Sequence, residues 1–340
     1  IFTPTEARTA VLLSHEPRSF EDIRENAGDL MSTPEELKKI LTAMVKKGGL
    51  EYYRENGRAF YANAPLVVGI YEFQVNRLTE EFISDFKAYT SEKRYGISFL
   101  STRRSQMRTI PIEKSIQAAL PTADYDQLIH LIQTAEPPFV VLPCICRRKK
   151  AMLNEPCRQT NRTETCLGMG RAAQTLKAMG TGREITQSEA IEIVRQNQDD
   201  GLVLQPSNTR KIDFLCACCG CCCSMLSLQK ELPMPLDFWE SGYTIAFKEQ
   251  LCIGCGLCKD KCVTNALLWS DCPEKDGQRP TPALDHSRCI GCGQCVSACK
   301  TGALTLAAKP AQSPPPKDRN ALNTALLENR KSRLSAVKTV

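Results

Sequence analysis

The chain has 340 residues, of which 42% are hydrophobic and 24% are charged, and its formal net charge is +6. This length exceeds one average domain, and a charge this small does not by itself indicate nucleic-acid binding. The sequence has no apolar stretch of about eighteen residues and no basic segment leading into an apolar run, so we expect a cytoplasmic protein without membrane insertion.

The first 64 residues are expected to form a winged-helix-like docking domain. Asn56-Gly57 between two apolar segments is a strong signal for a two-residue hairpin, which would be the wing. A helix before it should begin at Thr33, continue through Pro34 and Glu36 as a capping box, and end at Gly48-Gly49. Its apolar face would comprise Leu37, Ile40, Leu41 and Met44.

Residues 65–142 are expected to form a helical connector, with a long helix from about Pro65 to Tyr89. The basic residues Arg103, Arg104 and Arg108 follow, and we assign them no function. Residues 143–242 should form a helical, cysteine-rich module, with one helix after Cys166 and another capped by Thr186 and closed near Gly201. The whole chain is therefore expected to be a multidomain α+β protein.

The cysteines are unusual in number and position. All nineteen lie after residue 143. A disulfide scaffold would require an oxidising compartment, and it normally occurs in a small domain that lacks a sufficient core. Repeated CxxC spacings in a long chain favour metal ligands instead.

Residues 243–308 contain a duplicated motif, and a Pro-rich linker and basic tail follow at 309–340. The first copy has the spacing CxxCxxCxxxC, and the second repeats it together with its flanks, LCIGCGLC and RCIGCGQC. Three thiolates at intervals of three can surround one face of an iron–sulfur cubane, and the intervening glycines let backbone amides approach it. The motif cysteines are Cys252, Cys255, Cys258 and Cys262, and then Cys289, Cys292, Cys295 and Cys299.

This segment closely resembles the bacterial-type ferredoxin domain with two 4Fe-4S clusters. The resemblance implies that each cluster takes its fourth ligand from the other repeat. One cluster would use Cys252, Cys255, Cys258 and Cys299, and the other would use Cys289, Cys292, Cys295 and Cys262. The family usually has proline after each fourth cysteine, whereas this chain has Val263 and Lys300. Cys272, between the repeats, is expected to be a bystander.

The upstream cysteines predict at least one further metal site between residues 144 and 223. We expect a third iron–sulfur cluster built from Cys144 or Cys146 with Cys157, Cys166 and thiolates of the later run, its charge offset by Arg147 and Arg148. A structural zinc ion is the alternative, because both use thiolate ligands. The candidate ligands are Cys144, Cys146, Cys157, Cys166, Cys216, Cys218, Cys219, Cys221, Cys222 and Cys223.

The chain as a whole resembles multidomain 4Fe-4S dicluster proteins of anaerobic electron-transfer complexes. The resemblance implies an electron-transfer subunit that relays single low-potential electrons between a donor and a catalytic or flavin subunit. We assign no catalytic residue. One alternative is an oxidoreductase with a catalytic cluster in the cysteine-rich module, since Cys218-Cys219-Gly220 resembles the CCG modules of heterodisulfide-reductase-type proteins.

The other alternative is a redox-sensing transcription regulator that uses the winged helix to bind DNA. Lys38, Lys39, Lys46 and Lys47 lie on the expected recognition helix. However, residues 1–63 carry nine Lys or Arg against ten Asp or Glu. The resulting charge of −1 opposes phosphate contact, so we expect protein docking rather than nucleic-acid binding.

Overall fold

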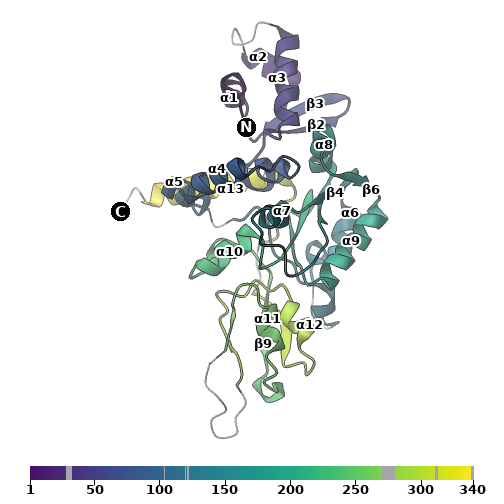
Figure 1. Ribbon diagram of the computed structural model, residues 1–340, viewed down its shortest axis with the longest axis vertical. Coiled ribbons are helices and arrows are strands. Elements are labelled where there is room, and N and C mark those ends of the chain that lie inside the picture. Colours follow the sequence, from purple (N-terminus) through teal and green to yellow (C-terminus); the bar gives the residue numbers. More distant parts are fainter. Residues whose placement is uncertain are drawn as a thin grey trace.

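The computed structural model describes residues 1–27, 33–102, 104–118, 120, 122–269, 280–310 and 313–337. It is a mixed α+β structure with several sheets. Figure 1 shows the N-terminal elements at one end of the long axis, the duplicated motif with α11 and α12 toward the other end, and the elements of residues 143–242 between them. Within the described residues, no helix is both long enough and apolar enough to cross a membrane.

The N-terminal elements follow the order helix, strand, two helices and a hairpin. Thr33 Oγ1 accepts the Glu36 N–H at 3.1 Å, so α3 begins where its cap predicts. Asn56 and Gly57 have φ values of 50° and 78°, as a two-residue hairpin turn requires. The sheet order is β1-β3-β2. The elements are α1 (Pro4–Val11), β1 (Arg18–Ser19), α2 (Phe20–Ala27), α3 (Pro34–Lys46), β2 (Leu50–Glu55) and β3 (Arg58–Asn63).

The long helix expected from Pro65 to Tyr89 is wrong. Val68 and Gly69 have non-helical backbone angles, and Val68 has a φ of +50°. The helix α4 (Glu80–Ser91) begins only after Thr79, whose hydroxyl accepts the Phe82 N–H at 3.1 Å. The apolar residues before Thr79 have nearly helical spacing but belong to separate turns. Two further helices, α5 (Lys93–Phe99) and α6 (Leu128–Thr134), follow.

The sequence suggested a helical cysteine-rich module. In the structure, helices surround a five-stranded antiparallel sheet on which the module is built. The strand order is β6-β4-β5-β8-β7. The strands β4 and β8 are short and buried on both faces, so they lack the polar alternation that marks a strand in sequence. The strands are β4 (Phe139–Pro143), β5 (Glu164–Met169), β6 (Arg183–Ile185), β7 (Val203–Pro206) and β8 (Phe214–Cys218). The helices are α7 (Ile145–Met152), α8 (Gly170–Met179), α9 (Gln187–Asp199) and α10 (Ser224–Glu231).

The two faces of this sheet have different chemistry. On one face, Leu215 and Ala217 of β8 join the main hydrophobic core with α6 and α9. Because successive strand residues point to opposite faces, Cys216 and Cys218 lie on the other face. Cys166 of β5 is also on that second face, where it packs with residues of β4 and α8.

The duplicated motif forms a small domain with approximate internal symmetry. β9 (Tyr243–Phe247) pairs antiparallel with β12 (Leu304–Ala308), and β10 (Leu267–Leu268) pairs with β11 (Ala283–Leu284). Each cysteine loop leads into a short helix, α11 (Leu257–Lys261) or α12 (Gln294–Ala298). Cys272 lies outside the described residues.

The tail forms α13 (Arg319–Val337), which lies alongside α4 and α5 in Figure 1. Arg319 at its start forms ion pairs with Asp213 at 2.5 Å and with Glu51 of β2 at 3.6 Å. Leu322 is buried. The tail therefore packs against the rest of the chain along at least its first turns.

Candidate metal centres

The first group of motif cysteines surrounds one cavity. This cavity of about 220 Å³ is lined by Cys252, Cys255, Cys258 and Cys299. Burial raises the pKa of Cys258 to about 11, and the charges of Cys252, Cys299 and Cys255 add to this effect. The structure thus brings together three cysteines of the first repeat and the last cysteine of the second.

The second group surrounds a smaller cavity of about 20 Å³, lined by Cys262, Cys289, Cys292 and Cys295. Burial raises the pKa of Cys292 to about 12, and the charges of Cys262 and Cys289 raise it further. Here the last cysteine of the first repeat joins three of the second. Both groupings are those that the ferredoxin resemblance implies.

Backbone amides stabilise thiolates at the crossing positions. The Ala266 N–H donates to Cys262 Sγ at 3.1 Å, and the Leu304 N–H donates to Cys299 Sγ at 3.4 Å. Burial opposes the thiolate of Cys299, but donors led by Leu304 and Thr301 outweigh it and lower its pKa. Hydrogen bonds to cluster sulfurs are one of the levers that set a reduction potential.

The two centres differ in their surroundings although their motifs are nearly identical. Gly256 and Gly293 occupy equivalent positions, with φ values of 74° and 77°. Among the described residues, a Cβ on Gly256 would meet nothing within 4 Å, whereas one on Gly293 would lie 2.0 Å from Ser115 Oγ. The loop of the second centre is therefore packed against the connector, and the loop of the first centre has no such described neighbour.

Apolar side chains are exposed around the first centre. Leu251, Ile253 and Leu257 are 45%, 49% and 45% exposed, and Cys255 is also exposed. By contrast, Cys289 and Cys295 of the second centre are buried. This difference makes the first centre the accessible end of the domain.

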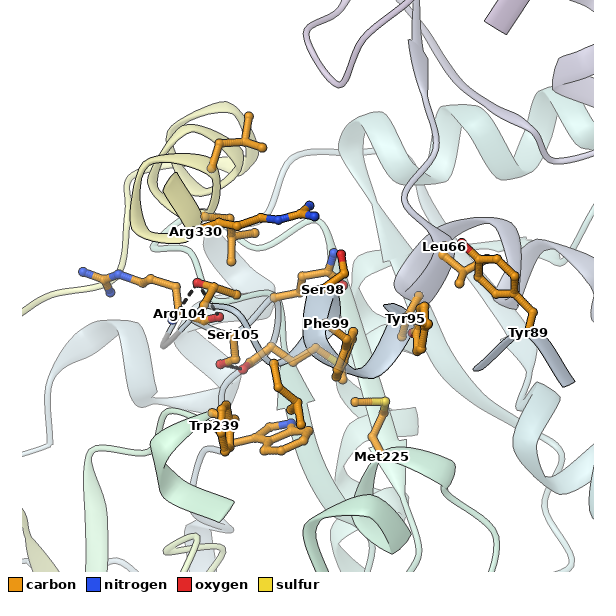
Figure 2. Close-up of a pocket in the computed structure, with 18 residues that line it drawn as sticks. Leu66, Tyr89, Tyr95, Ser98, Phe99, Arg104, Ser105, Met225, Trp239 and Arg330 are labelled. Carbon is orange, nitrogen blue, oxygen red and sulfur yellow. Dashed lines mark hydrogen bonds between the residues drawn. The ribbon is translucent and has the colours of Figure 1, made fainter. Parts of the chain in front are cut away.

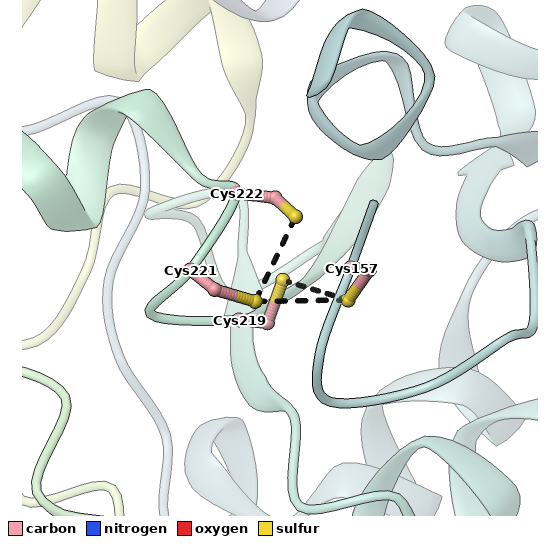
Figure 3. A group of neighbouring side chains, drawn as sticks. All are labelled: Cys157, Cys219, Cys221 and Cys222. Carbon is pink, nitrogen blue, oxygen red and sulfur yellow. Dashed lines mark hydrogen bonds between the residues drawn. The ribbon is translucent and has the colours of Figure 1, made fainter. Parts of the chain in front are cut away.

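Four upstream cysteines form a compact group, which we call the four-thiol group (Figure 3). Cys157 Sγ lies 3.6 Å from Cys219 Sγ and 3.7 Å from Cys221 Sγ, and Cys221 Sγ lies 3.7 Å from Cys222 Sγ. All four sulfur atoms lie within 4.8 Å of one another. The group could therefore hold a metal ion.

These distances fit one tetrahedral ion. Zinc–thiolate bonds of about 2.3 Å place the sulfurs of a tetrahedral site about 3.8 Å apart. A cubane separates its thiolates much further, because each binds a different iron. Among the described residues, no three of the ferredoxin cysteines bring their sulfur atoms within 4.8 Å of one another. The four-thiol group thus differs in scale from the cluster sites of the same chain.

The other six upstream cysteines form a second group, which we call the six-thiol ring. It comprises Cys144, Cys146, Cys166, Cys216, Cys218 and Cys223, each of which affects the pKa of two of the others. We expected Cys157 to share a centre with Cys166 and Cys144 or Cys146, whereas the structure places Cys157 with Cys219, Cys221 and Cys222. Two loops far apart in sequence, one before β5 and one after β8, bring Cys157 to the four-thiol group instead.

Arg147 lies close to both thiol groups, since Cys144 and Cys166 of the ring and Cys219 of the four-thiol group all influence its charge. Its guanidinium donates to Thr165 Oγ1 at 2.6 Å and to the Ala217 carbonyl at 2.8 Å. Burial lowers its pKa, but Cys144, Cys219 and Cys166 outweigh this effect and raise it. Arg148 instead points away and donates to Asn76 Oδ1.

Sequence reasoning missed two polar residues beside the six-thiol ring. Tyr71 packs against Cys146, and its buried hydroxyl has no hydrogen-bond partner among the described residues. Burial raises the pKa of Glu72 to about 7, with Cys144 as a further contributor. The unusual backbone of the preceding turn, where Val68 has a φ of +50°, marks this segment in the structure. A β-branched residue gives no sign of such a backbone in sequence.

An apolar cavity of about 370 Å³ lies between α5, α10 and α13 (Figure 2). Tyr95, Phe99, Met225 and Trp239 contribute to its walls. Arg104 at its edge is paired with Glu240 at 3.2 Å, and Arg103 lies outside the described residues. The expected basic group is therefore divided, since Arg108 is buried in a separate ion pair.

Comparison with known proteins identifies one part of the chain. The curated proteins and the solved structures yield no match. Residues 251–303 match the family model of the 4Fe-4S dicluster domain. Such a domain binds two 4Fe-4S clusters, and its chemistry is the transfer of single electrons. The chain therefore carries a 4Fe-4S dicluster domain, which contains both groups of motif cysteines.

Proposed function

We propose that this protein is an electron-transfer subunit of a larger redox complex, and that it relays single low-potential electrons between a donor and a catalytic or flavin subunit. The proposal is carried by the asymmetry of the two dicluster centres. The first centre is exposed among apolar side chains, and the second faces the interior of the same chain. This arrangement suits electron exchange with a partner at one end and transfer into the molecule at the other.

The ligand sets follow from the two cavities. The first cluster would be held by Cys252, Cys255, Cys258 and Cys299, and the second by Cys262, Cys289, Cys292 and Cys295. The donor set of four thiolates fits a 4Fe-4S cluster. Exposed Lys259 and Lys300 near the first centre favour a partner with an acidic rim.

The four-thiol group would hold one zinc ion with a structural role. Its sulfur spacing supports a single ion, and zinc with four cysteines is the usual closed structural site. The Gln159 N–H donates to Cys157 Sγ at 3.4 Å. Burial raises the pKa of Cys157, but donors from Thr160 and Gln159 outweigh it and lower this pKa to about 7. The thiolate form that binds metal is thereby favoured.

The first test is metal and spectroscopic analysis of the full chain purified without oxygen. We expect at least about eight irons, matching sulfide and about one zinc per chain. Reduction with dithionite should produce the EPR spectrum of two interacting 4Fe-4S clusters. Fewer than about eight irons with no such spectrum would contradict the electron-transfer proposal.

The N-terminal elements would form a winged helix that docks onto protein. Their order and sheet topology support this fold. Strand β2 of the hairpin is engaged within the chain, because the Tyr52 and Arg54 N–H groups donate to Thr175 Oγ1 and Gln174 Oε1 of α8. The tip at Asn56 and Gly57 stays exposed, so the preference for protein docking rests on the charge of residues 1–63.

The alternative, a DNA-binding regulator, is favoured by one observation. Lys38, Lys39 and Lys46 are exposed on α3. Fluorescence anisotropy with a labelled DNA duplex at low and physiological salt would distinguish the two. Docking predicts no binding that survives physiological salt, whereas tight, salt-resistant binding would favour the regulator.

A further inference from the structure

The six-thiol ring is a closed circuit of side chains. Each thiol affects the pKa of its two neighbours, and these pairs lead back to the first thiol. Cys216, Cys218 and Cys223 also pack in one hydrophobic cluster. Cys144, Cys218 and Cys223 are buried, and the other three are partly buried. The order around the ring is Cys144, Cys146, Cys223, Cys218, Cys216 and Cys166.

The fold positions these six side chains on one side of the central sheet. Cys216 and Cys218 are two residues apart on β8 and therefore share a face, which Cys166 of β5 joins. Cys144 and Cys223 occupy the N-cap positions of α7 and α10. A helix N-terminus favours a negative charge, so both caps favour thiolates.

The ring is too wide for one metal ion. Within the part of the chain that the structure describes, which includes all six cysteines, only the four-thiol group brings three or more ligand atoms within 4.8 Å of one another. A single tetrahedral ion, or two zinc ions sharing thiolates, would require such compact triplets. The ferredoxin cysteines do not form them either, so the ring has the wider spacing of a polynuclear site.

A buried tyrosine hydroxyl and a buried arginine lie beside the ring. Within the part of the chain that the structure describes, the Tyr71 hydroxyl has no hydrogen-bond partner, and Tyr71 packs against Cys146. A buried hydroxyl normally has a hydrogen-bond partner, so this one indicates an acceptor that belongs to the site. Arg147, 5% exposed, adds a buried positive charge next to Cys144 and Cys166. A cluster with several thiolates would offset that charge.

The ring also contacts the second dicluster centre. Cys218 and Cys223 belong to one continuous hydrophobic cluster with Ile290, and Cys216 and Cys292 pack against it. Cys292 lines the second dicluster cavity. Arg288 stabilises this contact by donating to the Leu232 and Lys230 carbonyls at the end of α10. Figure 1 shows α10 on the side of the central module that faces the dicluster domain.

We infer that the six-thiol ring binds a polynuclear iron–sulfur centre held by more than four thiolates, and that it is the inner end of the electron path. This inference rests on the proposed electron-transfer function. The path runs from the exposed first cluster through the second cluster to the ring. One electron leaves the reduced second cluster, which is oxidised, and the ring centre is reduced by that electron. Soft thiolates also bind copper(I) or zinc, but contact with a 4Fe-4S centre favours iron.

The decisive measurement is the metal content of the full wild-type chain, purified without oxygen. The two dicluster centres supply about eight irons, so the ring should add about four or more, together with sulfide. About eight irons with a normal dicluster EPR spectrum would overturn the ring proposal while leaving the proposed function intact. Zinc or copper in place of the additional iron would overturn it too.

Variants assign the additional iron to the ring. Cys166→Ala combined with Cys216→Ala should lose the additional iron and retain both the zinc and the dicluster spectrum. Cys157→Ser combined with Cys221→Ser should lose zinc and retain all iron, and Cys272→Ala should change nothing. If the dicluster spectrum is absent from the ring variant and the wild type alike, the proposed function fails instead.

Single substitutions test the number of ligands. Each of the six Cys→Ser changes should alter the Mössbauer and EPR spectra of the additional centre. If two of them leave those spectra unchanged, the centre is an ordinary cubane with four thiolates, and the proposal of a larger ligand set is overturned.

Tyr71→Phe provides a test that does not depend on losing the metal. The variant should retain all iron but shift the additional centre to a lower midpoint potential, because a hydroxyl donor stabilises the reduced cluster. Tyr61→Phe, in the N-terminal domain, is the matched control and should cause no shift. An unchanged potential in Tyr71→Phe would overturn the placement of this hydroxyl at the centre.

Discussion

A threonine hydroxyl lies beside the fourth cysteine of each repeat. Thr301 Oγ1 lies 3.7 Å from Cys299 Sγ, and Thr264 Oγ1 lies 3.9 Å from Cys262 Sγ. In a cluster-bound state the sulfur carries no proton, so the hydroxyl must donate. Such a donor stabilises the reduced cluster more than the oxidised one, because the reduced cluster is more negative.

Thr301→Val should therefore lower the midpoint potential of the first cluster. The expected shift is roughly tens of millivolts, since a one-electron couple moves by about 59 mV per tenfold change in relative stability. EPR-monitored redox titration would measure it. Thr281→Val is the control, because that hydroxyl contacts Glu249 instead. A shift of equal size in both variants would rule out the hydrogen bond as the cause.

A buried ion pair within the connector also joins the connector to the cysteine-rich module. Arg108 Nε donates to Asp126 Oδ1 at 3.1 Å, and the two side chains are 4% and 8% exposed. Arg108 also donates to the Ser207 and Thr209 carbonyls. Burial raises the pKa of Asp126, and Arg108 opposes that change.

Asp126→Ala should destabilise the chain by about 3–5 kcal/mol, because it leaves a buried guanidinium without its counter-ion. The measurement is the midpoint of urea unfolding for the metal-loaded protein. Glu55→Ala removes the exposed partner of Arg171 and should cost at most about 1 kcal/mol. Equal losses in the two variants would contradict the role assigned to burial.

At the scale of elements, the two cysteine loops have the same backbone but different neighbours. Gly254 and Gly291 have φ values of 68° and 63°, so the first glycine of each loop is also left-handed. A Cβ on Gly291 would lie 2.3 Å from the Tyr243 carbonyl oxygen. The repeat thus determines the loop conformation, and the packing partner determines how much room each loop has.

Gly256→Ala and Gly293→Ala form a matched pair that separates these effects. Both introduce a side chain at positive φ, at a cost of roughly 1–2 kcal/mol. Gly293→Ala also meets Ser115, so it should loosen the contact with the connector and lose iron faster in air. Iron retention and thermal unfolding would be measured for both variants. If Gly256→Ala proves the more damaging, the docking contact is not as described.

The central sheet explains how ten cysteines separate into two groups. Cys218 and Cys219 are adjacent, yet one belongs to the six-thiol ring and the other to the four-thiol group. Strand β8 ends at Cys218, and the chain then turns. The thiols of Cys219, Cys221 and Cys222 therefore belong to the four-thiol group, and Cys223 is again part of the six-thiol ring. The sequence FLCAC already contains the strand alternation that places Cys216 and Cys218 together, and this was the available signal.

At the scale of the whole molecule, the N-terminal domain is attached through its hairpin. Thr175 Oγ1 accepts the Tyr52 N–H at 3.0 Å and donates to the Tyr52 carbonyl at 2.9 Å. Arg171 lies over the Tyr53 ring at 4.2 Å. Through these contacts α8 packs against the edge strand β2.

Thr175→Val combined with Gln174→Ala should loosen this attachment without affecting the metal centres. Hydrogen bonds of this kind contribute about 1 kcal/mol each, so amide exchange in residues 50–63 should accelerate by roughly tenfold or more. Hydrogen-exchange mass spectrometry would measure it, with Gln196→Ala on α9 as the control. Unchanged exchange in the double variant would show that other contacts hold the hairpin.

Part of this structure was predictable because its signals are local. The helix cap at Thr33, the Asn56-Gly57 turn and the duplicated CxxCxxCxxxC spacing each depend on residues within a few positions of one another. Local geometry restricts such segments to few conformations. The dicluster domain, and with it single-electron chemistry, was determined by the sequence itself.

The rest was decided by tertiary structure, because it depends on contacts between distant segments. Cys157 lies 62 positions from Cys219, yet their sulfurs are 3.6 Å apart. Alternation within one strand shows that Cys216 and Cys218 share a face, but cysteine spacing does not reveal which thiols of other strands and loops lie on that same face. Only the packed sheet separates the six-thiol ring from the four-thiol group, and only domain docking makes one of two matching repeats the inner centre.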